Sequence, residues 1–90
     1  MPKVTQELTI ANKLGLHARA ASELAKTASH YDCDIKVVCC ETVADSKSIL
    51  SLMCLSAAPG QTIKVTADGT DAHEAVRAIA ALVEANFNER

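Results

Sequence analysis

Each periodic segment of this chain is apolar on one side only, and this pattern limits the fold more than any other feature. Residues 4–10 alternate between apolar and polar side chains, as in a strand with one buried face. Residues 35–39 and 63–67 alternate in the same way, and residues 42–44 are expected to add a short strand. Such strands form a mostly antiparallel sheet with one packed face and one face open to water.

Three further segments carry their apolar residues at the period of a helix. Residues 16–28, 49–55 and 72–87 each have one apolar stripe, and the last stripe ends with Phe87. A helix with a single stripe must pack it against a sheet or another helix, so the elements form two layers. The sequence therefore predicts one α+β domain over residues 1–90, with β-α-β-β-α-β-α order and three helices on one face of a four-stranded sheet.

The ends of the helices and one turn are marked less directly. Three polar side chains compete to cap the short second helix: Asp45, Ser46 and Ser48. Asp71 stands three residues before Glu74, which is the spacing of a capping box at the start of the third helix. A hairpin turn is expected near residues 40–41, although no Asn-Gly or Asp-Gly pair marks it.

Composition and charge exclude several classes of function. The formal net charge of -2 argues against a nucleic-acid surface. An RNA-binding sheet would need aromatic side chains, and this chain has only Tyr31 and Phe87, both off the expected strands. No apolar run approaches the roughly 20 residues of a membrane span, so we expect a cytoplasmic protein without membrane insertion. We also expect a monomer that needs no cofactor.

The four cysteines and three histidines do not have the spacing of a metal site. The chain has no C-x-x-C pair, and its first loop has Gly-Leu-His where a copper or zinc chaperone would have paired thiolates. Cys39 and Cys40 are adjacent, which is unsuitable for a bridge between distant segments. We therefore interpret the cysteines as small hydrophobes or bystanders in a reducing compartment, and we predict no metal site.

His17 and Arg19 stand where the first helix should begin, and a helix start needs neither residue. The first N–H groups of a helix lack intrahelical partners and lie at the positive end of its dipole, so they attract anions. An imidazole is a competent nucleophile at neutral pH, and a guanidinium can hold the oxygens of a phosphoryl group. The pattern predicts a phosphoryl relay on His17, with His30 and His73 as surface residues. A regulatory or ligand-binding module with an inert His17 is the alternative.

Two stretches of the chain resemble one known family. The stretch GLHARAA, residues 15–21, resembles the active-site motif of HPr, the histidine-containing phosphocarrier of the bacterial phosphotransferase system. The stretch KSILSLMCL, residues 47–55, is similar to that family's second signature, around a regulatory serine. The resemblance covers nearly the whole chain and implies an open-faced two-layer sandwich with sheet order 1-4-2-3.

The resemblance also implies a function for these residues. His17 would accept a phosphoryl group, through Nδ1, from Enzyme I, which phosphoenolpyruvate charges, and Arg19 would position it. An enzyme IIA domain would be the acceptor, so the chain would be a transfer intermediate rather than a turnover enzyme. Ser48 would be phosphorylated by an HPr kinase/phosphorylase, although a serine at this place is equally typical of a helix cap.

Docking to partner proteins is expected to use residues beside His17, with plain core as the alternative interpretation of the apolar ones. The expected residues are Leu14, Leu16, Ala20, Lys47, Leu50 and Met53. Two positions depart from the family pattern, since Ala20 replaces the usual proline and Ser51 a usual glycine. Ala20, together with the stretch NKLG, is similar to regulatory and nitrogen-related forms of HPr, whereas Ser51 bears on the fit of the regulatory kinase. The downstream role, sugar uptake or metabolic regulation, therefore stays open.

Overall fold

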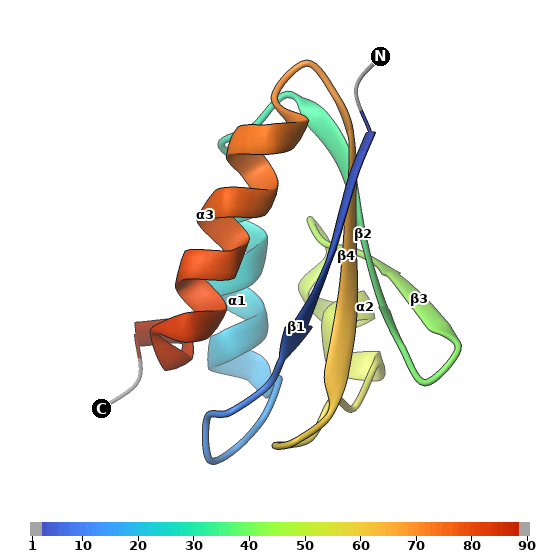
Figure 1. The fold of residues 1–90 in the computed structure, drawn as a ribbon. Helices are drawn as coiled ribbons and strands as arrows, with labels where there is room; N and C mark the ends of the chain where they lie inside the picture. The colour runs from blue at the N-terminus through green and yellow to red at the C-terminus, as the bar shows by residue number, and fades with distance from the viewer. Residues whose placement is uncertain (1–2, 89–90) are drawn as a thin grey trace.

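The computed structural model describes residues 3–88, and it has seven main elements followed by one short turn. Their order is β1 (Lys3–Thr9), α1 (Ala18–Ala28), β2 (Cys33–Cys39), β3 (Thr42–Asp45), α2 (Ile49–Cys54), β4 (Thr62–Gly69), α3 (Ala72–Glu84) and the 3-10 turn η1 (Asn86–Asn88). The helices lie on one face of the sheet, with α1 beside α3 (Figure 1). The predicted β-α-β-β-α-β-α order is confirmed.

The four strands form one sheet in the order β1-β4-β2-β3, and each neighbouring pair is antiparallel. This order confirms the one that the family resemblance implied. On the open face, side chains of opposite charge stand across from each other at three pairs of positions: Lys3 with Asp68, Glu7 with Lys64, and Lys36 with Asp45. Such cross-strand pairs stabilise a sheet on the face that water covers.

The core lies between the sheet and the helices and is almost entirely aliphatic. The strands contribute fully buried branched side chains, which include Ile35, Val37, Ile63 and Val65. The helices contribute Leu24 and Ile79 together with many alanines, which include Ala20, Ala21, Ala28 and Ala75. Small side chains on α1 and α3 allow both helices to lie close to the sheet and to each other. Within residues 3–88, none of these helices has the length and hydropathy that a membrane crossing requires.

Ser48 is the N-cap of α2, and the two competing residues are used differently. Its hydroxyl oxygen accepts a hydrogen bond from the Ser51 backbone N–H at 3.3 Å. The Asp45 carboxylate accepts from the Lys47 N–H at 3.0 Å, one turn too early to cap the helix. Ser46 is fully buried, and its hydroxyl has no hydrogen-bond partner among the described residues.

The start and end of α3 correct two predictions. Asp71 is the N-cap residue, but its side chain makes no capping bond, because Oδ2 accepts from the Asp32 N–H at 2.8 Å. The predicted capping box with Glu74 is therefore wrong. The helix ends at Glu84, so Phe87 is not part of its stripe. Phe87 reaches the core from η1, where its backbone is left-handed with φ 57°, and it is fully buried there.

The expected hairpin turn between β2 and β3 is present. Cys39 pairs with Thr42, which leaves Cys40 and Glu41 as the two turn residues. Both have positive φ, 51° and 70°, as a type I′ turn requires. The register of the strands thus imposes left-handed backbone on two residues that rarely adopt it.

Candidate functional site

His17 is the N-cap residue of α1. Its backbone is extended, with φ -83° and ψ -175°, and its Nδ1 accepts a hydrogen bond from the Arg19 backbone N–H at 3.3 Å. Its carbonyl oxygen accepts the first helical bond, from the Ala21 N–H at 2.8 Å. Because Nδ1 is an acceptor, the proton of the neutral ring is assigned to Nε2, and the half-buried imidazole stands at the positive end of the helix dipole.

The loop before His17 is held against the segment that follows α2. Gly15 has φ +66°, and a Cβ at this position would overlap the carbonyl oxygen of Ala57. The Leu16 N–H donates to that same oxygen at 2.9 Å. Asn12 is buried, and its Nδ2 donates to the Gly15 carbonyl oxygen at 2.7 Å. Asn12 was not identified as part of the site from the sequence. Its position in the loop, three residues before Gly15, was the one feature of the sequence that could have indicated this role.

Arg19 lies in the first turn of α1 and is exposed. This turn contains no acidic residue, so no carboxylate within it neutralises the guanidinium. The helical ladder starts with the Ala21 N–H, so the N–H groups of residues 18–20 precede it. Backbone donors and the basic residue Arg19 therefore belong to the same helix end as His17, as an anion bound there would require.

The expected docking residues divide into exposed and buried ones. Leu14 is 69% exposed, Leu50 75% and Met53 39%. Leu16 and Ala20 are 3% and 0% exposed, so they belong to the core and their assignment to the docking surface is wrong. The exposed three lie on the loop before α1 and on α2, which packs beside α1. Ile49, 42% exposed at the start of α2, extends this apolar surface and was not predicted.

Lys47 and Ser48 hold the chain at the start of α2. The Lys47 ammonium donates to the Cys33 carbonyl oxygen at 3.2 Å and to that of Tyr31 at 3.4 Å, so it is directed toward the junction of α1 and β2. Ser48 is half-buried and its hydroxyl is the cap described above. The capping role of Ser48 is thus part of the structure, and its phosphorylation stays a prediction.

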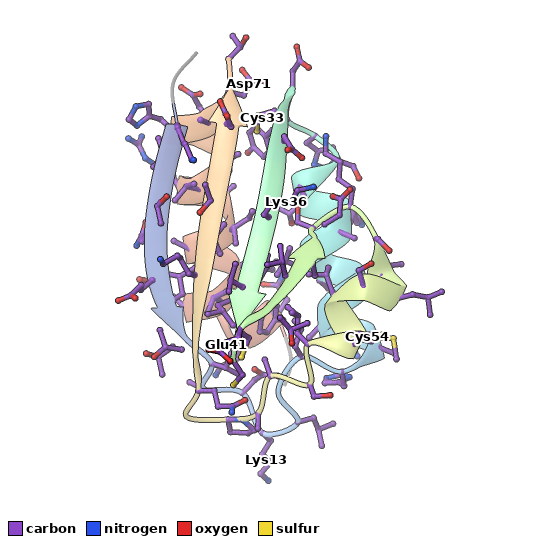
Figure 2. The ribbon with its side chains drawn as sticks, turned by 90° about the vertical axis from the view of Figure 1, so that its right-hand side faces the viewer. Lys13, Cys33, Lys36, Glu41, Cys54 and Asp71 are labelled. Carbon is purple, nitrogen blue, oxygen red and sulfur yellow. The ribbon has the colours of Figure 1, made fainter. Side chains whose placement is uncertain are left out.

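The loop before α1 and the hairpin turn between β2 and β3 lie at the same end of the molecule (Figure 2). Figure 2 shows Lys13, in the loop before α1, and Glu41, in the hairpin turn, at one end of the molecule, while Cys33 and Asp71 lie at the other. A groove between β1 and α3 is lined by residues that include Val4, His73 and Arg77, and not by His17. Among residues 3–88, no group of three or more metal-ligating side chains could hold an ion.

The fold and the His17 site together define a class of protein: an open-faced α+β sandwich whose first helix is capped by a histidine. The family whose sequence model matches residues 4–85 is described as the PTS HPr component phosphorylation site. The chain belongs to this HPr family of phosphocarrier proteins of the phosphotransferase system.

Individual relatives are similar over nearly their full length. The chain is 47% identical to the phosphocarrier protein NPr of Shewanella violacea, over 99% of this chain and 98% of that protein. It is 42% identical to the phosphocarrier protein HPr of Xylella fastidiosa, over 92% and 93% of the two chains. The crystal structure of HPr from Thermoanaerobacter tengcongensis superposes with a TM-score of 0.87 at 39% identity, covering 100% of this chain and 99% of the other.

Proposed function

We propose that this chain, acting as a single domain, receives a phosphoryl group on Nδ1 of His17 from Enzyme I and passes it to an enzyme IIA domain. Phosphoenolpyruvate is the original donor. The observation that carries the proposal is the position of Nδ1, which accepts a bond from the Arg19 N–H at the N-terminus of α1. Membership of the HPr family supports the same role.

The transfer step follows from the state of the imidazole. The Nδ1 lone pair attacks phosphorus, and the bond from phosphorus to the donor breaks as the new N–P bond forms. The Arg19 N–H, which donates to Nδ1 at 3.3 Å before transfer, becomes a donor to a phosphoryl oxygen. The Arg19 guanidinium neutralises a second oxygen. Because Nε2 keeps its proton, the phosphorylated ring is cationic and leaves readily when the next acceptor attacks.

Protein partners, rather than a small substrate, fit the surroundings of His17. Leu14, Leu50 and Met53 expose apolar side chains next to α1, and Leu50 and Met53 lie three residues apart on the same side of α2. An exposed apolar surface of this kind is typical of a protein contact. Enzyme I and the enzyme IIA domain would use it in turn, each covering His17 during transfer.

Phosphorylation of Ser48 by an HPr kinase/phosphorylase would regulate this exchange. Ser48 caps α2, whose outer side carries Leu50 and Met53, so a phosphate there would change the charge at the border of the docking surface. The similarity to an NPr protein favours metabolic regulation over sugar uptake as the downstream role. Proline has no backbone N–H, so Ala20 in its place adds one N–H donor to the first turn of α1.

The experiment that tests the proposal is phosphorylation with purified Enzyme I and phosphoenolpyruvate. The protein should gain one acid-labile phosphoryl group, and an enzyme IIA domain should remove it. His17→Ala should gain none, while the exposed-histidine variants His30→Ala and His73→Ala should be labelled normally. Labelling of His17→Ala would refute the assignment, and an unlabelled natural protein would favour the alternative of a regulatory module with an inert His17.

The variants should fold alike, so that a loss of labelling reports on chemistry. The cap bond of His17 contributes about 1 kcal/mol to the free energy of unfolding, by analogy with other N-caps. Circular dichroism and urea unfolding of His17→Ala check this directly. A folded His17→Ala protein that is not labelled separates a lost nucleophile from a lost fold.

A further inference from the structure

Cys39 and Cys40 bring two thiols together at the end of β2. Their Sγ atoms are 3.6 Å apart, although the two residues point to different sides of a regular strand. The left-handed backbone of Cys40, φ 51°, is what brings its side chain beside that of Cys39. Cys39 is buried and Cys40 is exposed, so the pair joins the core to the solvent.

The amide of Gln61 contacts both sulfur atoms. Its Nε2 donates to Cys40 Sγ at 3.4 Å, and the Cys39 thiol donates to its Oε1 at 3.9 Å. The same Oε1 accepts from the Ala58 N–H at 2.7 Å. The Gln61 side chain therefore holds the two thiols in place and links them to the turn before β4.

We propose that Cys39 and Cys40 form a redox-active dithiol, which a hydroperoxide oxidises to a disulfide between the two neighbouring residues. This is a modification site separate from His17, and it does not depend on the proposed phosphoryl transfer. Cys40 is the thiol that reacts with the peroxide and Cys39 is the thiol that completes the disulfide.

The roles follow from exposure. Cys40 meets solvent and is accessible to a small oxidant. Burial raises the pKa of the Cys39 thiol above its ordinary value, and the hydrogen bond with Cys40 adds to this shift. Cys39 therefore stays protonated and slow toward peroxide, but it stands 3.6 Å from the sulfur that has reacted.

The reaction balances in two steps. The Cys40 sulfur attacks the peroxide, so that an S–O bond forms, the O–O bond breaks and the alcohol or water product takes up the thiol proton. Cys39 then attacks the Cys40 sulfenic acid: an S–S bond forms, the S–O bond breaks, and hydroxide leaves with the Cys39 proton as water. Both sulfurs are oxidised, and the peroxide is the species reduced.

The product should be easily reduced again. Most protein disulfides join residues whose Cα atoms are about 5.5–6 Å apart, whereas neighbours across a trans peptide are about 3.8 Å apart. Closing so small a ring strains the bond, and strained disulfides are the labile ones. The pair is therefore suited to a transient response to peroxide rather than to permanent stabilisation.

The test uses the full-length protein and hydrogen peroxide, followed by denaturation, alkylation with N-ethylmaleimide and mass spectrometry. The oxidised protein should lose two hydrogen atoms, and alkylation should fall from four cysteines to two, Cys33 and Cys54. Dithiothreitol should restore all four. The alkylation pattern identifies the pair, because a peptide with both Cys39 and Cys40 should carry no label.

Two exposed cysteines provide the variant and its matched control. Cys40→Ser should abolish the loss of two hydrogens, whereas Cys54→Ser should leave it unchanged; Cys54 lies on the outer side of α2 (Figure 2). Oxidation should also shift the Ala58 amide resonance, because Gln61 loses its contact with Cys40, and should not shift that of Gly69 at the other end of β4. Full alkylation after peroxide, or a disulfide in Cys40→Ser, would overturn the proposal.

Discussion

Gly15→Ala tests whether the loop before α1 holds His17 in place. The new Cβ would overlap the Ala57 carbonyl oxygen and would come within 3.1 Å of the Ala58 Cα, both of them backbone atoms that cannot rotate away. The left-handed φ of +66° adds a strain of about 1–2 kcal/mol for a residue with a Cβ. Displacing the loop also breaks the Leu16–Ala57 hydrogen bond, a further loss of about 1 kcal/mol.

The free energy of unfolding should therefore fall by about 2–3 kcal/mol, measured by urea denaturation followed by circular dichroism. Gly60→Ala is the matched control: its φ is +91°, but an added Cβ meets nothing within 4 Å among the described residues. Gly60→Ala should lower the free energy of unfolding only by the strain of the left-handed backbone, about 1–2 kcal/mol, and should be phosphorylated at the same rate as the natural protein. Gly15→Ala should be phosphorylated more slowly. Equal losses of stability and equal phosphorylation rates for the two variants would show that the loop before α1 does not hold His17 in place.

Substitutions at three other positions test single features. Arg19→Lys keeps the positive charge but loses the planar guanidinium, so phosphoryl transfer should slow by about tenfold in stopped-flow or quench assays. Transfer at the rate of the natural protein would show that Arg19 is only a solvent-exposed charge. Ser48→Asp should raise the apparent KM for the reaction with Enzyme I, and the effect should weaken in high salt, whereas Ser48→Ala should change only stability. Equal kinetics of these two variants would leave Ser48 as a cap alone. Ser46→Ala removes a buried hydroxyl that has no partner among the described residues, so it should raise the free energy of unfolding by about 1 kcal/mol; a clear loss of stability in urea would contradict this.

The architecture was predictable because it depends on short-range periodicity. The one-sided strands and helices follow from spacing alone, and the residues at the helix N-terminus, His17 and Arg19, were recognisable because a helix start requires neither. The sheet order needed the family resemblance, since antiparallel strands with one apolar face can pair in several orders.

Features that depend on tertiary contacts were not predictable in the same way. Asp71 matches a capping box, yet its carboxylate binds the Asp32 N–H, which is distant in sequence. Leu16 and Leu50 are the same residue type near the same site, yet Leu16 is buried and Leu50 is exposed. Leu16 lies in a loop that its N–H holds against the Ala57 carbonyl oxygen, whereas Leu50 lies on the side of α2 that faces away from the core. The contact of Gln61 with two thiols likewise joins the hairpin turn to a segment 21 residues away.

Phosphoryl transfer to Nδ1 of His17 is tested most directly by identifying which nitrogen carries the phosphoryl group. Protein with ¹⁵N-labelled histidine, phosphorylated by Enzyme I and phosphoenolpyruvate, can be analysed by long-range ¹H–¹⁵N and ³¹P spectra. The structure places the Nδ1 lone pair of His17 beside the Arg19 N–H, so we expect a single phosphorus coupling, to Nδ1 of His17. Coupling to Nε2 of His17, or to either nitrogen of His30 or His73, would contradict it.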